Sequence, residues 1–237
     1  MTSLSQPFQI GIDGPVAVGK STVARMLAQR LGFLYVDTGA MYRATALLTI
    51  RENVDPENEE AVADLLRRHQ ITLATPQGTQ EDGRKITVFL DDEDVSWAIR
   101  TEEVSQASSK VAQHKQVREQ LVTQQQAIAS KNNVVMEGRD ITYRVLPNAP
   151  LKIYLDANDA KRANWRQTEL LQAGQDVTEE KVLKELKERD HRDKTRVVDP
   201  LQVVDDAWYF DRSDYELEDV IAKIEERAKQ LWVQSVK

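Results

Sequence analysis

The apolar positions along the chain form short runs separated by stretches with helical spacing. Five runs are too short for helices and predict buried strands, at residues 8–13, 33–36, 133–138, 151–157 and 207–210. Elsewhere apolar residues recur at helical spacing and predict helices at 20–31, 38–51, 101–130, 159–173, 178–193 and 216–232. Strands that alternate with helices indicate the α/β class, a doubly wound parallel sheet with helices on both faces.

The segment from residue 70 to residue 96 interrupts this alternation. Its β-branched runs flank a polar stretch with one proline and two glycines, which predicts a pair of strands joined by a long turn. The helix before it is predicted to begin with Asp55 as its cap and Pro56 in its first turn. We interpret the segment as an insertion in the α/β domain.

Composition narrows the class of protein. A chain of 237 residues can bury one α/β core with an inserted or mobile subdomain. The net charge of -7 argues against a nucleic-acid-binding surface, although arginines gathered in one cleft can still bind a phosphate. The absence of cysteine excludes disulfides and thiolate metal sites. The sequence contains no export signal and no apolar stretch of membrane-spanning length, so we expect a cytoplasmic protein.

The stretch "GIDGPVAVGKST", residues 11–22, contains the pattern G-x-x-x-x-G-K-[ST] between a predicted strand and a predicted helix. Its glycines let backbone N–H groups face phosphate oxygens, and the following helix adds the positive end of its dipole. Lys20 neutralises phosphate charge, and the Ser21 hydroxyl can ligate Mg²⁺. This context favours a phosphate loop over a glycine turn with a chance lysine. The residues predicted to form this phosphate-binding loop are Gly14, Pro15, Val16, Ala17, Val18, Gly19, Lys20, Ser21 and Thr22.

Two further motifs follow predicted strands, at the edge where doubly wound folds bind ligands. "DTGAMYR", residues 37–43, places Arg43 one and a half turns into a helix, where it can reach the cleft. "EGRD", residues 137–140, places an arginine beside a carboxylate. Taken alone, the first motif also fits an ordinary helix start capped by Thr38 with Arg43 in solvent. The second also fits an acidic turn that begins a helix.

The charged stretch "KELKERDHRDKTR", residues 184–196, has two interpretations. Interleaved charges usually mark a solvated helix face. Helical spacing instead favours a functional face, since the apolar stripe of this helix continues into charged positions. The stripe comprises Val182, Leu186, Arg189, Asp193 and Arg196. We expect the guanidinium groups to enter a cleft and face a transferring phosphoryl group.

Together these motifs resemble the bacterial cytidylate kinases, of the nucleoside monophosphate kinase group. "GIDGPVAVGKST", "DTGAMYR", "IRTEEVSQASSKVA", "VRE", "EGRD" and "KERDHRDKTRVVDPL" occur in the family's order and span nearly the whole chain. The resemblance implies ATP-dependent phosphorylation of CMP and dCMP on a five-stranded parallel core with a monophosphate-binding insertion and a mobile lid. It assigns the core to about 1–55, 131–158 and 197–237, the insertion to about 56–130 and the lid to about 159–196.

The resemblance also implies roles for residues at matching positions. The residues around the transferring group would be Lys20, Arg139 and Arg189. The acceptor site would comprise Thr38, Arg43, Ser109, Arg118, Arg139, Asp140, Asp193 and Arg196. Mg²⁺ would be ligated by Ser21, with Asp37 acting through a water molecule. The chain departs from the family in carrying Val16 and Val18, where smaller residues are common.

Two alternatives stand beside this interpretation. One is a kinase for another small acceptor, such as UMP, and the other is a nucleotide-binding switch, because a phosphate loop alone does not separate these classes. An enzyme makes ADP in proportion to a monophosphate, whereas a switch hydrolyses ATP slowly without one. We expect a monomer that binds ATP and CMP or dCMP, and that has no nucleic-acid or membrane partner.

Overall fold

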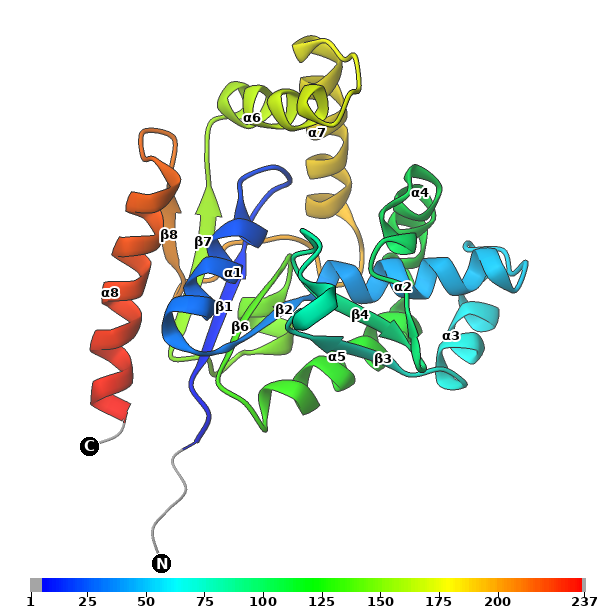
Figure 1. The fold of residues 1–237 in the computed structure, drawn as a ribbon, viewed down its shortest axis with the longest axis horizontal. Helices are drawn as coiled ribbons and strands as arrows, with labels where there is room; N and C mark the ends of the chain where they lie inside the picture. The colour runs from blue at the N-terminus through cyan, green and yellow to red at the C-terminus, as the bar shows by residue number, and fades with distance from the viewer. Residues whose placement is uncertain (1–5, 236–237) are drawn as a thin grey trace, which may run out of the picture. The chain divides into compact units, whose positions relative to one another are not determined.

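The computed structural model describes residues 6–235 and contains two compact units. One unit runs up to Phe33 and resumes at Asn133, and the other comprises Leu34–Asn132. The main sheet has five strands in the order β2-β6-β1-β7-β8 (Figure 1). These strands are β1 (Gln9–Asp13), β2 (Leu34–Asp37), β6 (Val134–Gly138), β7 (Leu151–Asp156) and β8 (Trp208–Asp211). All five lie at the predicted runs, which confirms the α/β fold.

The strands β6, β1, β7 and β8 pair in parallel, so their carboxyl ends meet at one edge of the sheet. Asp13, the last residue of β1, lies beside Gly138 of β6 and Tyr154 of β7. Ile10 and Ile12 are fully buried, as expected for a central strand covered on both faces. The phosphate loop and the "EGRD" motif therefore leave neighbouring strands at the edge where ligands bind in such folds.

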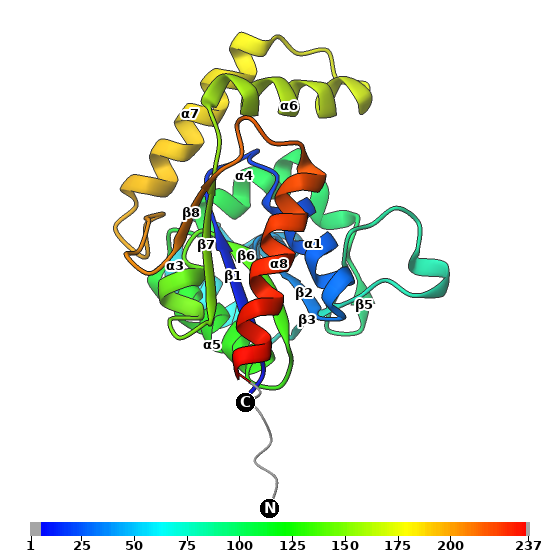
Figure 2. The same ribbon diagram turned by 90° about the vertical axis from the view of Figure 1, so that its left-hand side faces the viewer.

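The described part of the first unit contains four α-helices, each at a predicted position. They are α1 (Lys20–Leu31), α6 (Asp159–Gln172), α7 (Glu179–Thr195) and α8 (Leu217–Ser235). Helices α1 and α8 lie side by side, and α1 packs on β1 and β6 (Figure 2). Helices α6 and α7 pack against each other, following β7 in the chain. None of the helices described in residues 6–235 is long and apolar enough to cross a membrane.

The second unit combines helices with a small antiparallel sheet, which contains the strand pair predicted within residues 70–96. Its helices are α2 (Thr38–Arg51), α3 (Glu59–Arg67), α4 (Glu102–Val111) and α5 (Lys115–Ala129). Its strands are β3 (Ile71–Ala74), β4 (Thr87–Leu90) and β5 (Glu93–Asp94), in that order in the sheet. Strands β3 and β4 are the predicted pair, and the short β5 extends it.

One helix start differs from the prediction. Helix α3 begins at Glu59, and its cap is Asn58, whose side chain accepts a hydrogen bond from the Ala61 N–H. Asp55 instead accepts a hydrogen bond from the Glu57 N–H and closes the turn before the helix. The prediction of Asp55 as the cap was wrong because two side chains suited to capping lie three residues apart, and the structure uses the second.

An aromatic cluster ties the start of β1 to the end of α8. The Phe33 ring lies 4.8 Å from the Trp232 ring and 6.1 Å from the Phe8 ring, between centroids, and Phe33 is buried. We expect Phe33→Ala to lower the free energy of unfolding by about 3 kcal/mol, because it leaves a cavity in this cluster. Urea unfolding measures the change. The exposed Gln29→Ala, on the neighbouring turn of α1, is the control, and an equal effect of both variants would contradict a cluster that stabilises the fold.

Candidate active site

The phosphate loop connects β1 to α1 through backbone conformations that favour glycine. A Cβ atom at Gly14 would lie 2.0 Å from the carbonyl oxygen of Leu155, so no larger residue fits there. Ala17 and Gly19 have φ angles of 59° and 88°. Inside the loop, Lys20 Nζ donates a hydrogen bond of 2.6 Å to the Pro15 carbonyl. The loop therefore has the turned backbone that lets N–H groups gather around an anion.

Side chains of α6 and α7 bind both polar main-chain groups of Val16. Its N–H donates to Asp190 Oδ1 at 3.0 Å, and its carbonyl accepts from Arg162 Nη1 at 2.8 Å. Arg162 and Asp190 also form an ion pair of 2.7 Å, and both are buried. The hydrogen bonds to Val16 attach both helices to the loop. The two side chains depend on each other, because removing either one would leave a buried charge unpaired.

The apolar stripe of α7 continues at Asp190, and not at Arg189 as predicted. Asp190 is buried whereas Arg189 is exposed, since the strict spacing of four residues from Val182 and Leu186 leads to position 190. Val182 and Leu186 form a small apolar core with Ala163 of α6. Val16 and Ala17 of the phosphate loop pack against this core, so the valine that departs from the family pattern has a packing role.

Charged side chains from three segments meet around Asp193 on α7. Arg139 Nε donates to Asp193 Oδ2 at 2.7 Å, and Arg196 Nη2 lies 3.5 Å from Asp140 Oδ1. Although burial opposes its charge, Arg139 holds the pKa of Asp193 below its ordinary value, with smaller contributions from Arg189 and Arg196. The first unit therefore brings together five of the predicted site residues, namely Arg139, Asp140, Arg189, Asp193 and Arg196.

Lys20 and Ser21, at the start of α1, lie beside acidic side chains. Burial, and then the positive charge of Arg139, lower the pKa of Lys20, while Glu137 opposes that shift. The Ser21 hydroxyl donates to Glu137 Oε1 at 2.7 Å. A hydroxyl and a carboxylate are the oxygen donors that Mg²⁺ prefers, so the residues present fit this ion. Within residues 6–235, no group of three or more His, Asp or Glu side chains could hold a metal ion.

The carboxylate of Asp13 is fully buried at the end of β1. It accepts hydrogen bonds from the N–H groups of Ile141 and Thr142, at 2.9 and 2.8 Å, and from the Thr142 hydroxyl at 2.7 Å. These donors belong to a π-helical turn, Ile141–Val145, that follows Asp140. Burial, with a smaller contribution from Asp140, raises the pKa of Asp13 to about 6, against the lowering effect of the hydrogen bonds. Asp13 thus fixes the turn next to the "EGRD" motif.

In the second unit, Asp37 and Arg43 form a pair at the start of α2. Asp37 caps the helix by accepting from the Ala40 N–H at 3.0 Å, and it accepts from Arg43 Nη2 at 2.9 Å. The alternative of a Thr38 cap and a solvated Arg43 was therefore wrong. Arg43 Nε is buried and has no hydrogen-bond partner among residues 6–235. Desolvation, and then the like charge of Arg43, lower the pKa of Arg100, which adds a second cation nearby.

The other predicted acceptor residues of this unit lie on three helices. Thr38 is the buried first residue of α2. Ser109, on α4, donates a hydrogen bond from its hydroxyl to the Ser105 carbonyl. Arg118, on α5, is 1% exposed, donates to the Ala112 carbonyl at 3.1 Å, and lies 5.4 Å from the centre of the Tyr42 ring. Arg118 is therefore held in one orientation by its own unit.

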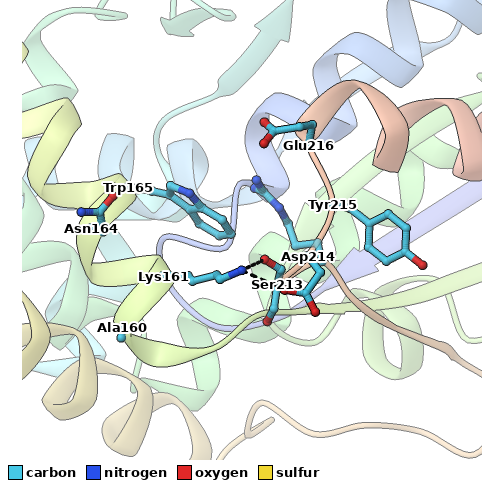
Figure 3. Close-up of a pocket in the computed structure, with 9 residues that line it drawn as sticks. Ala160, Lys161, Asn164, Trp165, Ser213, Asp214, Tyr215 and Glu216 are labelled. Carbon is cyan, nitrogen blue, oxygen red and sulfur yellow. Dashed lines mark hydrogen bonds and ion pairs between the residues drawn. The ribbon is translucent and has the colours of Figure 1, made fainter.

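A cavity of about 540 Å³ lies between α6 and the segment that follows β8 (Figure 3). Lys161 Nζ donates to the Ser213 carbonyl and, at 2.9 Å, to Asp214 Oδ1. The Trp165 ring extends from α6 toward Ser213 and Glu216. An aromatic face beside amide, hydroxyl and carboxylate groups suits a flat heterocycle with polar edges.

Three residues that shape this site were missed by the sequence analysis. Asp13 was visible as a carboxylate at the end of a buried apolar run, where a charge needs hydrogen-bond partners. Asp190 was visible through strict four-residue spacing on α7. Arg162 carried no such signal, because its partners are a main-chain carbonyl 146 residues away and a distant carboxylate.

The chain is similar to known proteins along nearly its whole length. Residues 10–230 match the family model described as cytidylate kinase. A cytidylate kinase of Bacillus subtilis (strain 168) is 43% identical over 227 residues, covering 96% of this chain and 99% of that protein. A cytidylate kinase of Streptococcus sanguinis (strain SK36) is 45% identical over 224 residues, covering 94% of this chain and 97% of that protein.

The raised pKa of Asp13 predicts a measurable dependence of stability on pH. A folded-state pKa of about 6 lies above the ordinary value of 3.8, so the carboxyl stabilises the fold at low pH and loses this contribution as the pH rises through 6. A shift of about two pKa units corresponds to about 3 kcal/mol. We expect the stability of the wild type relative to Asp13→Asn to fall by about that amount between pH 4 and pH 7.

Urea unfolding of both proteins across this pH range measures the difference. Asp92→Asn, at an exposed position of the second unit, is the matched control. A wild-type advantage over Asp13→Asn that stays constant with pH would show that Asp13 ionises without a penalty from burial.

Proposed function

The chain belongs to the cytidylate kinase family, and we propose that the residues described above carry out its reaction. The activity is the ATP-dependent phosphorylation of CMP and dCMP to CDP and dCDP. The observation that supports the assignment of residues is the cluster at the carboxyl edge of the sheet. There the buried Lys20 of the phosphate loop lies close enough to Arg139 and Asp193 for their charges to change its pKa.

The phosphate loop binds the phosphates of ATP. Backbone N–H groups of the loop other than that of Val16, which donates to Asp190, contact the phosphate oxygens together with Lys20. The N-terminal end of α1 adds a favourable dipole. The pKa of Lys20 is lowered in the free protein by burial and by Arg139, so an incoming anion restores the charge of its ammonium group. The base of ATP occupies the cavity beside Trp165, whose aromatic face it can stack against.

Phosphoryl transfer requires positioning and charge compensation more than covalent chemistry. A phosphate oxygen of CMP forms a bond to the γ-phosphorus of ATP while the bond from that phosphorus to the β–γ bridging oxygen breaks, and ADP leaves. Lys20, Arg139 and Arg189 surround the transferring group and compensate the charge on its equatorial oxygens. No side chain forms a covalent intermediate.

The acceptor phosphate is bound by Arg43, together with Thr38 and Arg196. Arg43 supports this role because its buried Nε has no hydrogen-bond partner among the described residues. A buried donor of this kind is satisfied when a phosphate oxygen binds to it. Asp193 and Arg139 complete the predicted acceptor site and keep each other charged through their ion pair.

The cytosine base is recognised by Ser109, Arg118 and Asp140. Cytosine presents acceptors at O2 and N3 and a donor amine at C4, which match hydroxyl and guanidinium donors and a carboxylate acceptor. Uracil presents a donor at N3 and an acceptor at C4, so it would face the same groups with unfavourable contacts. This pattern favours CMP and dCMP over the alternative acceptor UMP.

Mg²⁺ accompanies ATP in this proposal. Ser21 would ligate the ion while its hydroxyl proton remains hydrogen-bonded to Glu137, and Asp37 would act through a water molecule. The bound ion supplies positive charge that offsets the phosphates of ATP. The Asp37 carboxylate also caps α2 and pairs with Arg43. Because its oxygens already accept these hydrogen bonds, we propose that Asp37 contacts the ion through a water molecule and does not ligate it directly.

The parts of the chain have separate tasks in this scheme. The core of about residues 1–55, 131–158 and 197–237 binds ATP, and the insertion of about 56–130 binds the acceptor. The lid of about 159–196 excludes water when substrates are bound, which limits wasteful hydrolysis of ATP. We propose that the protein works as a cytoplasmic monomer without nucleic-acid partners.

Replacement of Lys20 tests the role of the phosphate loop. Lys20→Met removes a charge that matters most as the γ-phosphoryl group transfers, and we expect a loss of about 10²–10³ in kcat. A coupled assay of ADP formation with saturating ATP and each nucleoside monophosphate in turn measures it. Lys229→Met, at an exposed position of α8, is the control. A Lys20→Met enzyme that keeps more than half of the wild-type kcat would contradict this role.

Replacement of Asp140 tests base recognition. Asp140→Ala removes both the acceptor for the cytosine amine and the repulsion against uracil, so activity on CMP should fall far more than activity on UMP. Sites built on such hydrogen bonds discriminate between similar substrates by up to about 10⁴–10⁵ in kcat/KM. The ratio of kcat/KM for CMP to that for UMP can therefore fall by a large factor in the variant. Measuring kcat/KM for both substrates decides the matter, with the exposed Asp64→Ala as control. An unchanged ratio would remove Asp140 from base recognition.

A further inference from the structure

Arg212 joins the phosphate loop to the cavity beside α6. It lies in the segment between β8 and α8, and its Nη1 donates to the Val18 carbonyl at 3.0 Å. Its guanidinium carbon lies 3.9 Å from the centre of the Trp165 ring. Arg212 is only 7% exposed. A buried cation therefore stacks on an aromatic ring with one face and holds a loop carbonyl with one edge.

The direction of the Val18 carbonyl fixes the direction of the next N–H group. A trans peptide unit is planar, so its C=O and N–H bonds point in opposite directions. When Arg212 holds the Val18 oxygen on the outer side of the loop, the Gly19 N–H must face the other way. That inner side is where the phosphates of ATP bind in the proposed function. Arg162 has the same relation to the Val16 carbonyl and the Ala17 N–H.

A side chain at Gly19 would displace Arg212 from its contact with the loop. A Cβ atom there would lie 2.4 Å from Arg212 Nη1, and the φ angle of 88° at Gly19 already favours glycine. Gly19, the second glycine of the phosphate-loop pattern, therefore has two roles. It permits the turn, and it lets a guanidinium group approach the backbone from outside.

Arg212 is kept in this place at a cost. Burial lowers its pKa, against the favourable charge of Glu216. Its Nε is buried without a hydrogen-bond partner among residues 6–235. An unsatisfied buried donor destabilises a fold, so an arginine is a poor choice for packing alone. Methionine or leucine would fill the same space without this penalty.

We propose that Arg212 is a positioning residue that sets the phosphate loop for ATP by holding the Val18 carbonyl, with Trp165 supporting its guanidinium plane. The proposal rests on binding of the ATP phosphates at this loop. Arg212 does not touch the transferring group; it acts through the Gly19 N–H. Trp165 and Arg212 both line the cavity (Figure 3), and Arg212 also contacts the phosphate loop at the Val18 carbonyl.

Kinetics of Arg212→Met test the proposal. The variant keeps an apolar stem but loses the donor, and we expect kcat/KM for ATP to fall by about 10- to 100-fold, as misplacement of a binding group does. The KM for CMP should stay unchanged. Arg212→Lys should recover part of the loss, because an ammonium group can still donate to the carbonyl but cannot stack as a plane. Arg227→Met, at an exposed position of α8, is the matched control.

A spectroscopic measurement separates positioning from general stability. In ¹⁵N-labelled wild-type protein, pyrophosphate should shift the Gly19 amide resonance, and the shift should be much smaller in Arg212→Met. Urea unfolding shows whether the variants are folded. If Arg212→Met does not fold, Trp165→Phe provides the test, since it keeps an aromatic ring but gives less stacking surface and should reduce the same shift in part.

The outcomes distinguish this proposal from the proposed function. A wild-type protein that binds pyrophosphate but does not phosphorylate CMP would overturn the proposed function. In that case the shift of the Gly19 resonance would still test the positioning role of Arg212. A folded Arg212→Met with wild-type kcat/KM for ATP and an unchanged Gly19 shift would overturn the positioning role. Equal losses for ATP and CMP would also overturn it, because they would indicate a general disturbance of the fold.

Discussion

The buried carboxylate of Asp13 connects the start of the phosphate loop to the turn that follows Asp140. Both segments leave neighbouring parallel strands, and three hydrogen bonds to one side chain fix the distance between them. The raised pKa of Asp13 shows that this connection works against the free energy of folding at neutral pH. A fold that keeps such a group gains a defined geometry at the sheet edge, where the reacting groups must be placed accurately.

The charges around this edge are arranged so that an anion completes them. Burial and Arg139 disfavour the charged form of Lys20, and Asp193 in turn pairs with Arg139. In the second unit, Arg43 donates a hydrogen bond from Nη2 to Asp37, and its buried Nε has no hydrogen-bond partner among the described residues. In each unit, taken by itself, these cations lie in surroundings that a bound anion would improve. Preorganisation of this kind costs the protein no rearrangement during the reaction.

Most of the fold followed from the sequence because β1, β6 and β7 are buried along nearly their whole length and the helices keep a regular apolar stripe. The errors lie where one residue decides the outcome. Asn58 took the cap in place of Asp55, and Asp190 took the buried position predicted for Arg189, one residue or about 100° around the helix away. The predicted acceptor residues follow the family motifs, and their roles stay predictions. Arg212 was out of reach because its acceptor is a main-chain atom, which leaves no pattern in the sequence.

The attachment of α6 and α7 to the phosphate loop has a consequence for how the chain can change over evolution. Arg162 and Asp190 bind the main-chain atoms of Val16, so substitution of that side chain leaves their hydrogen bonds in place. The side chain of Val16 itself packs against the small core of Ala163, Val182 and Leu186. The volume of the side chain at position 16 can therefore change during evolution if the residues of that core change with it. Arg162 and Asp190 should instead be retained as a pair, because the loss of one leaves the other as an unpaired buried charge. A segment comprising α6 and α7 that was exchanged between relatives would keep these hydrogen bonds to the loop if it carried both residues.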